Sequence, residues 1–282
     1  MTKLDKKIIF IFKQRLHEEV VSINDCSHGI AQVVKIVETD KNKYIIKFPR
    51  KGNELMIYRE NFVCSHLKIK LLPKIILKGR TFLIETFING ETLNKAKPQN
   101  INFYNTLGKT IKKIHQIKMS GFGELMTGGK GRQANPTQHI EFLLKENLPL
   151  LSKIKTFDKK LLQHTKKFIY DNISLFDSDK SVLLHFDLID DNILVKNNKL
   201  AGIIDFGDLS CGPKEYDLAK AYLENPNKKF SHILNGYGKN LVNMKKIKYF
   251  AVLHLLYIIP YYSSHKEKYA QYSKLLKALV KY

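Results

Sequence analysis

The 282-residue sequence contains few cysteines, and they are widely spaced. The three cysteines, Cys26, Cys64 and Cys211, are odd in number and lack the spacing of a metal-binding motif. This pattern argues against a disulfide framework and indicates a reducing compartment. Each cysteine is therefore expected to act as a small hydrophobic side chain rather than as a nucleophile.

Long hydrophobic segments are missing as well. Residues 8–12 are apolar and follow basic residues, but five residues are too few for the core of a signal peptide. The longest apolar run, Tyr249–Pro260, contains His254 and is too short to span a bilayer. We therefore expect a soluble cytoplasmic protein that has no membrane partner.

Acidic residues and arginine are scarce compared with lysine. The chain has 48 lysine and arginine residues against 26 acidic ones, which gives a formal net charge of +22. Only five of the basic residues are arginine, the side chain that best recognises bases and clamps phosphates. Because the lysines are also scattered through the chain, we expect no specific nucleic-acid partner, and only non-specific binding of polyanions at low salt.

The chain is long enough for one large domain or two lobes, and 44% of its residues are hydrophobic. Up to residue 90 the pattern predicts a helix and loop in residues 1–25, strands at 32–38, 44–48, 74–78 and 81–88, and a helix at 53–67. From residue 91 the pattern is helical, with helices expected near 104–114, 135–151, 158–176 and 245–282. The glycine-rich residues 121–132 are expected to form a mobile surface loop.

The densest pattern of polar residues lies in the central stretch, residues 183–208. Two apolar runs, residues 193–195 and 200–204, flank the polar turn 196–199, which predicts a β-hairpin. The hairpin brings Asn192 and Asp205 together, and one carboxylate with one amide oxygen suits Mg²⁺ carrying a phosphate chain. Asp187 is then the carboxylate left to face an incoming hydroxyl.

The spacing H-x-D-x-x-x-x-N followed by I-D-F-G-D is carried by His185, Asp187, Asn192 and Asp205. It resembles the aminoglycoside phosphotransferase and choline kinase family, relatives of the protein kinases. The resemblance covers roughly residues 25–240. It implies a two-lobed α+β protein-kinase-like fold, with a small antiparallel-sheet lobe for the nucleotide in residues 1–90. A larger, mainly helical lobe for catalysis and the acceptor is implied in residues 91–282.

The resemblance also assigns roles in the small lobe. Lys47, at the end of a strand, would hold the α- and β-phosphates, and Glu60 in the following helix would pair with it. Glu54 is the competing acid, but it lies in the first helical turn, where the helix dipole alone explains it. The backbone of Thr86 and Ile88 would hydrogen-bond the adenine edge.

Some phosphate-binding signatures are incomplete. Ser27 begins the expected nucleotide-covering loop Ser27-His28-Gly29, which is not the G-x-G-x-x-G of protein kinases. A second glycine-rich stretch fails the Walker pattern, because Lys130 is followed by Gly131 rather than by Ser or Thr. No A-P-E segment follows Asp205, which disfavours a protein kinase.

The implied reaction moves the γ-phosphoryl group of ATP, with GTP as the alternative, to a hydroxyl of a small molecule. Asn192 and Asp205 would hold Mg²⁺, and Asp187 would accept the proton of the hydroxyl. His185 would orient the loop by hydrogen bonds. Asp217, in a segment matching the family's G-x-x-x-x-D-L-A, is expected to cap the helix that it opens.

Three functions stay open from the sequence alone: phosphorylation of an aminoglycoside-type antibiotic, a metabolic kinase for choline, a sugar or a homoserine-like alcohol, and non-catalytic nucleotide or polyanion binding. The intact set of Lys47, Asp187, Asn192 and Asp205 argues against the third. Residues 177–217 hold nine acids and four lysines, which favours a cationic acceptor and hence an aminoglycoside. Against it, the last 38 residues carry eight lysines and only Glu267 as an acid. We expect a monomer or a weak dimer.

Overall fold

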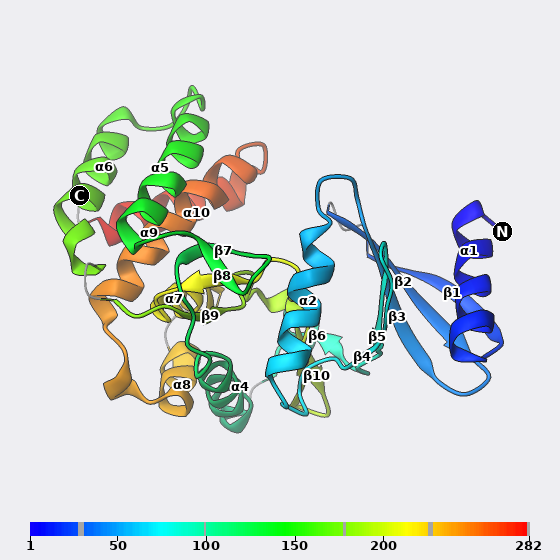
Figure 1. The fold of residues 1–282 in the computed structure, drawn as a ribbon. Coiled ribbons are helices and arrows are strands. Elements are labelled where there is room, and N and C mark those ends of the chain that lie inside the picture. Colours follow the sequence, from blue (N-terminus) through cyan, green and yellow to red (C-terminus); the bar gives the residue numbers. More distant parts are fainter. Residues whose placement is uncertain (28–30, 99, 177–178, 225–227, 281–282) are drawn as a thin grey trace. The chain divides into compact units, whose positions relative to one another are not determined.

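The structure is a computed structural model that describes residues 1–27, 31–98, 100–176, 179–224 and 228–280. Its contacts divide the chain into two compact units (Figure 1). Unit 1 comprises Met1–Pro98 and Asp191–Gly207, and unit 2 comprises Gln99–Asp190 and Asp208–Tyr282. The sequence predicts a boundary at residue 90, whereas the contacts also place the central hairpin in the same unit as the N-terminal segment.

A five-stranded antiparallel sheet is the framework of unit 1, with the order β1-β2-β3-β5-β4. The strands are β1 (Val20–Ser27), β2 (Gln32–Thr39), β3 (Lys43–Pro49), β4 (Ile75–Lys78) and β5 (Leu83–Thr86). The prediction missed β1, because residues 1–25 were expected to hold only a helix and a loop. This strand lies at the edge of the sheet and exposes much of its apolar surface, so its sequence shows no clear buried face.

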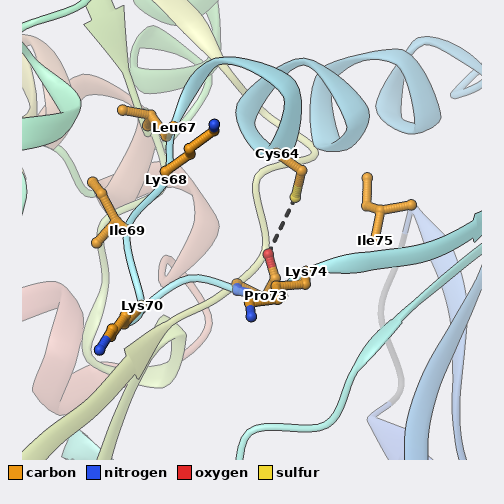
Figure 2. Close-up of a pocket in the computed structure, with 8 residues that line it drawn as sticks. All are labelled: Cys64, Leu67, Lys68, Ile69, Lys70, Pro73, Lys74 and Ile75. Atoms are coloured by element: carbon orange, nitrogen blue, oxygen red, sulfur yellow. Dashed lines mark hydrogen bonds between the residues drawn. The ribbon is translucent and has the colours of Figure 1, made fainter.

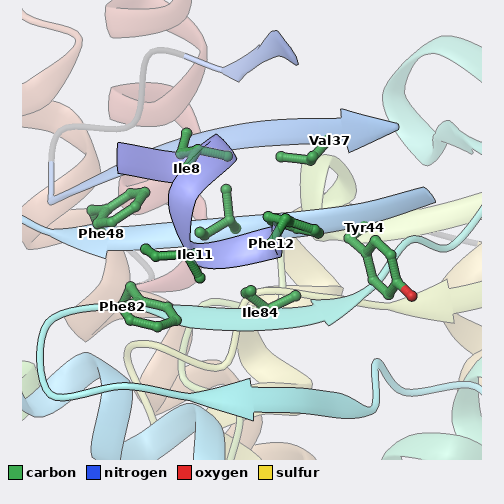
Figure 3. Close-up of a cluster of buried hydrophobic side chains, with 9 residues drawn as sticks. Ile8, Ile11, Phe12, Val37, Tyr44, Phe48, Phe82 and Ile84 are labelled. Carbon is green, nitrogen blue, oxygen red and sulfur yellow. The ribbon is translucent and has the colours of Figure 1, made fainter. Parts of the chain in front are cut away.

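One face of this sheet is covered by helix α1 (Lys3–Ile11) and the π-helical turn η1 (Phe12–Leu16). Figure 3 shows the resulting apolar cluster, which consists of Ile8, Ile11, Phe12, Val37, Tyr44, Ile46, Phe48, Phe82 and Ile84. Successive side chains of a strand point to opposite faces. Because Ile46 and Phe48 belong to the cluster, Lys47 between them points to the other face of the sheet.

The predicted central hairpin is present in unit 1. Strands β10 (Ile193–Lys196) and β11 (Lys199–Ile203) form a three-stranded sheet with β6 (Glu91–Thr92), which leads into helix α3 (Leu93–Ala96). The two-residue turn consists of Asn197 and Asn198, whose φ angles are 51° and 57°. Two-residue hairpin turns of this kind need positive φ at both positions, which asparagine tolerates better than most residues. Helix α2 (Leu55–His66) completes the unit.

Unit 2 is mainly helical, as predicted from residue 91 onward. Its helices are α4 (Ile101–Ile114), α5 (Pro136–Ser152), α6 (Lys159–Asn172), α7 (Glu215–Glu224), α8 (Lys228–Tyr237), α9 (Met244–Tyr261) and α10 (Lys266–Leu279). Short 3₁₀ turns follow α6 (η2, Ile173–Phe176) and α8 (η4, Lys239–Leu241), and a third (η3, Asp190–Asn192) precedes β10. In the described part of the chain, each helix falls short of the length or the apolar character needed to cross a membrane.

Unit 2 also contains a four-stranded sheet that the sequence did not predict, with the order β8-β7-β12-β9. Its strands are β7 (Phe122–Met126), β8 (Lys130–Gln133), β9 (Val182–Leu184) and β12 (Ser210–Gly212). The expected surface loop at residues 121–132 is therefore wrong, because this stretch forms the β7–β8 hairpin. A Cβ atom on Gly131 would overlap the backbone nitrogen of Phe122. The glycines thus allow two backbones to approach closely rather than marking a free loop.

Candidate active site

Lys47 lies at the centre of a buried charged cluster in unit 1, here named the Lys47 cluster and consisting of Lys47, Glu60 and Glu85. The Lys47 Nζ atom is 2.6 Å from Glu60 Oε1 and 3.1 Å from Glu85 Oε1, and all three side chains are buried. Asp205 Oδ1 lies 4.0 Å from the same nitrogen. Burial alone would lower the pKa of Lys47, but the carboxylates of Glu60 and Glu85 reverse this and raise it well above its usual value.

Burial acts in the opposite direction on the two acids of the cluster, because it raises the pKa of a carboxyl group. Burial raises the pKa of Glu60 to about 8, although the positive charge of Lys47 works against this rise. Burial likewise raises the pKa of Glu85, and Lys47 again opposes it. One ammonium group thus faces two buried carboxyl groups. Glu54, the competing acid from the sequence, is exposed and instead accepts a hydrogen bond from the backbone of Gly52.

Helix α2 also holds the backbone that follows Asp205. Arg59 Nη1 donates a hydrogen bond to the Gly207 carbonyl oxygen over 3.2 Å. A Cβ atom at Gly207 would overlap the side chain of Met56, so the glycine of I-D-F-G-D permits this close approach. Asp205 itself has a left-handed backbone, with φ of 65°, which is rare outside glycine and marks a constrained position.

The hairpin brings the predicted metal-binding residues to one end. The Ile204 N–H donates to the Asn192 carbonyl oxygen over 2.9 Å, and Asp205 follows directly. Asn192 is buried, while 47% of the Asp205 side chain is exposed. Among the described residues, no group of three His, Cys, Asp or Glu side chains could hold a metal ion. A pair of oxygen donors nevertheless fits Mg²⁺, which takes its remaining ligands from phosphate and water.

The other predicted nucleotide contacts also lie in unit 1. Thr86 ends β5, where its N–H donates to the Lys74 carbonyl and its hydroxyl oxygen accepts from the Lys74 N–H. Ile88 packs against Gly202 of β11, where a Cβ atom would lie 2.7 Å from Ile88 Cδ1. Ser27 is the last residue of β1, and the rest of the expected covering loop, His28 and Gly29, lies outside the described residues.

A separate cavity of about 390 Å³ lies in unit 1 beyond the end of α2 (Figure 2). Its lining residues are Cys64, Leu67, Lys68, Ile69, Lys70, Pro73, Lys74 and Ile75, which include none of the predicted site residues. Cys64 Sγ donates a hydrogen bond to the Pro73 carbonyl oxygen over 3.1 Å. Burial raises the pKa of this thiol to about 11, so the side chain stays protonated, in line with the expectation that it is no nucleophile.

In unit 2, the loop that carries Asp187 is held by a buried carboxylate. Asp217 accepts hydrogen bonds from the backbone N–H groups of His185 over 2.7 Å and of Phe186 over 2.9 Å. The expectation that Asp217 caps its own helix is therefore wrong, because its oxygens point to the loop. His185, predicted to orient this loop, is fully buried beside it.

Asp217 is supported from two further helices. His115, at the end of α4, lies 3.0 Å from Asp217 Oδ2 through its Nε2 atom, and its Nδ1 atom lies 3.0 Å from the hydroxyl of Tyr237 in α8. Burial would raise the pKa of Asp217, but the hydrogen bond and the charge of His115 hold it below its usual value. The carboxylate that fixes the loop is thus itself fixed in its ionised form.

Asp187 has a partner that the sequence analysis missed. Lys220 of α7 places its Nζ atom 3.2 Å from Asp187 Oδ1, with 13% of the lysine side chain and 31% of the aspartate side chain exposed. Asp217 and Lys220 are three positions apart, which puts them on the same face of α7. This helix therefore holds both the backbone and the side chain of the Asp187 loop. In the sequence, this arrangement is indicated by the segment D-L-A-K at residues 217–220, whose first and last residues lie one helical turn apart.

The fold and these residues define a class of protein: a kinase-like phosphotransferase, with a buried lysine–glutamate pair on an antiparallel sheet and an aspartate loop in a helical unit. The chain belongs to the phosphotransferase enzyme family, whose sequence pattern it matches over residues 22–248. This confirms the resemblance that the central motif suggested. No curated protein sequence matched the chain.

Solved structures agree with this assignment. A thermostable mutant of aminoglycoside phosphotransferase APH(4)-Ia, in a ternary complex with AMP-PNP and hygromycin B, has a TM-score of 0.77 at 14% identity, with 100% of this chain and 98% of that chain covered. The gentamicin complex of APH(2")-IIa gives a TM-score of 0.67 at 18% identity, covering 98% of this chain and 97% of that one. At such identities the similarity shows the fold alone. It confirms the predicted kinase-like α+β fold.

Proposed function

We propose that the protein transfers the γ-phosphoryl group of ATP to a hydroxyl group of a small molecule. The observation that carries this proposal is the Lys47 cluster. A buried ion cluster is often no more stable than apolar residues of similar volume, so its presence on the sheet of unit 1 favours a role in binding rather than in folding. An ammonium group held by carboxylates is suited to neutralise nucleotide phosphates.

In this proposal, unit 1 binds the nucleotide. Lys47 contacts the phosphates, the backbone of Thr86 and Ile88 contacts the adenine, and Ser27 begins the segment that covers the phosphates. Asn192 and Asp205 would hold Mg²⁺, which when bound neutralises part of the phosphate charge. ATP is the expected nucleotide and GTP the alternative, since the solved relatives include complexes with AMP-PNP and with GDP.

Unit 2 supplies the base. Asp187 accepts a hydrogen bond from the acceptor hydroxyl and takes its proton as the oxygen bonds to the γ-phosphorus. The bond between the γ-phosphorus and the β–γ bridging oxygen breaks, and the nucleoside diphosphate leaves with the bonding electrons. His185 and Asp217 act on this step through the loop backbone, because they keep Asp187 in place.

For the acceptor, we propose an aminoglycoside-type compound. The solved relatives bind hygromycin B and gentamicin, and residues 177–217 are rich in acids. Several of these acids already have partners within the fold: Asp179 is paired with Lys246, and Asp217 holds the Asp187 loop. The remaining negative charge that can attract a cationic substrate is thus smaller than the sequence suggests.

A metabolic kinase for a neutral sugar or a homoserine-like alcohol is the second candidate. The observation that favours it is Lys220, whose ammonium group lies beside Asp187. A cation at this place repels a positively charged group close to the reacting hydroxyl and attracts a carboxylate there.

The experiment that tests the function is ATP consumption by the purified protein with aminoglycosides, choline, neutral sugars and homoserine, each at two salt concentrations. We expect turnover of an aminoglycoside that slows at higher salt, because salt screens its attraction to the acids. Turnover of a neutral acceptor, with inert aminoglycosides and no salt effect, would instead identify the metabolic kinase. If none of these compounds causes the protein to consume ATP, both proposed classes of acceptor are contradicted.

A further inference from the structure

The Lys47 cluster contains one acid more than a simple lysine–glutamate pair. We infer that Glu85 is a second positioning residue for Lys47, which shares with Glu60 the task of holding the ammonium group where nucleotide phosphates bind. Either carboxylate alone then keeps Lys47 paired. This inference rests on the proposed nucleotide-binding role of Lys47.

Glu60 and Glu85 reach Lys47 from different elements. Glu60 comes from helix α2 and lies 2.6 Å from the Lys47 nitrogen, whereas Glu85 comes from strand β5 and lies 3.1 Å away. In the sheet, Ile45 pairs with Glu85 and Lys47 pairs with Leu83. Glu85 and Lys47 are therefore diagonal neighbours on the same face of two hydrogen-bonded strands, within reach of long side chains.

The position of Glu85 is set by the sheet itself. Strand β5 is hydrogen-bonded on both sides, to β3 and to β4. The next residue, Thr86, is joined to Lys74 by two hydrogen bonds. Glu85 thus holds Lys47 through the same framework that carries Lys47, independently of helix α2. It also lies next to Thr86, the proposed adenine contact.

An acid at this place is not needed to fill the core. Its neighbours Leu83 and Ile84 are apolar and buried, and an apolar side chain would suit such an environment better than a carboxyl group. Asp205, at 4.0 Å from the same ammonium, adds to the negative charge there. A role in restraining Lys47, which faces the phosphates in the proposed function, explains why a second acid is buried here.

Direct binding of Mg²⁺–AMP-PNP, measured by titration calorimetry, tests this role without an acceptor. The variants are Glu60→Gln, Glu85→Gln and the double variant, with Glu38→Gln on the exposed side of β2 as the matched control. Glutamine keeps the shape of glutamate but cannot become a carboxylate. We expect each single variant to weaken binding about threefold to tenfold, and the double variant to weaken it about 100-fold or more, beyond the product of the two. Glu38→Gln should bind as the wild-type protein does.

A second comparison shows whether Glu85 acts through Lys47. Lys47→Ala should weaken binding by about tenfold or more, and adding Glu85→Gln to it should cause no further loss. A further loss would mean that Glu85 contacts the nucleotide directly, which would overturn the positioning role. These two proteins and the single variants decide the question even where the Glu60/Glu85 double variant does not fold.

Melting temperatures, measured on the same variants, distinguish an effect on binding from an effect on folding. If Glu85→Gln lowers only the melting temperature, and leaves the affinity unchanged in both the wild-type and the Glu60→Gln backgrounds, Glu85 is a structural residue and the inference is wrong. Absence of AMP-PNP binding by the wild-type protein would instead overturn the proposed function. The two failures are therefore distinguishable.

Discussion

Asp187 is the residue on which the proposed chemistry depends most directly. It follows a buried strand, and its side chain is partly exposed. The backbone N–H groups of its loop donate hydrogen bonds to the carboxylate of Asp217. We expect Asp187→Asn to lower kcat by on the order of 10²–10⁴, because the amide cannot take the hydroxyl proton. Stability should change little, since the substitution weakens only the partly exposed ion pair between Asp187 and Lys220.

The measurement is turnover with any accepted acceptor, together with thermal unfolding of the same sample. Lys167→Ala, which breaks an exposed ion pair with Asp171, is the control for loss of a surface pair. Near wild-type turnover by Asp187→Asn would show that another group is the base.

The outcome for single residues shows what a sequence can reveal. Asn192 and Asp205 were placed correctly at one end of a hairpin, because the motif and its turn are local in the sequence. Glu85 and Lys220 were missed, although both contact residues that were named. Their roles depend on which strands pair and on which helix face meets the loop, and this information comes only from contacts between distant segments.

The packing of α4 on α8 positions the support of the Asp187 loop. A Cβ atom on Gly108 of α4 would overlap the Ile233 carbonyl oxygen, and one on Gly236 of α8 would overlap that of Asn105. The ends of these helices carry His115, which contacts Asp217, and Tyr237, which contacts His115. We expect Gly108→Ala to destabilise the protein by about 1–3 kcal/mol, because the backbones must separate.

Chemical unfolding and turnover of the same variant test this packing. Lys109→Ala, on the exposed side of α4, is the control and should leave stability nearly unchanged. If Gly108→Ala folds, its kcat should fall more than its nucleotide KM rises, since the change acts on the Asp187 loop. A variant as stable and as active as the wild-type protein would refute the close contact.

Two helices carry buried histidines that make unit 2 sensitive to acid. Burial, together with the nearby charge of Lys220, lowers the pKa of His254 in α9 to about 3, and burial lowers that of His139 in α5 to about 4, from 6.5. Below pH 6.5 the unfolded chain binds protons that the folded protein does not. Stability therefore falls as the pH drops from 6.5, by up to about 1.4 kcal/mol per pH unit for each histidine.

Urea unfolding at pH 7.5 and pH 5 measures this loss. His254 Nε2 lies 3.1 Å from the Tyr216 carbonyl oxygen, and a glutamine can donate a similar hydrogen bond without titrating. His254→Gln should therefore reduce the difference in stability between the two pH values, whereas His17→Asn at an exposed position should not. An unchanged difference in His254→Gln would mean that other groups cause the acid sensitivity.

The sequence predicted some helices and strands more accurately than others. Helices α4, α5 and α6 and the strands β2 and β3 have regular patterns of apolar residues, and they were found near their predicted positions. The strand β1 and the hairpin β7–β8 were missed. The first is an exposed edge strand, and the second is rich in glycine, so neither shows the alternation on which strand prediction depends.

The whole chain carries a formal net charge of +22, and its lysines are distributed over both units. Within the fold, three buried or partly buried lysines are paired with acids: Lys47 with Glu60, Lys220 with Asp187, and Lys246 with Asp179. Most of the other lysines are exposed, so most of the excess charge lies on the surface. Such a surface attracts nucleic acids whatever their base sequence, because each lysine replaces a counterion at a phosphate group.

We expect the protein to bind duplex DNA at about 20 mM salt and to release it by about 200 mM, with equal affinity for unrelated sequences. Fluorescence anisotropy with two duplexes of different sequence across this salt range measures both properties. Mg²⁺–AMP-PNP should not compete, because the Lys47 cluster is buried and plays no part in the surface charge. Lysozyme, another basic protein, is a control for charge alone. Binding that persists at high salt, or that prefers one sequence, would show a specific nucleic-acid site and would contradict the expectation that this chain binds polyanions only through its surface charge.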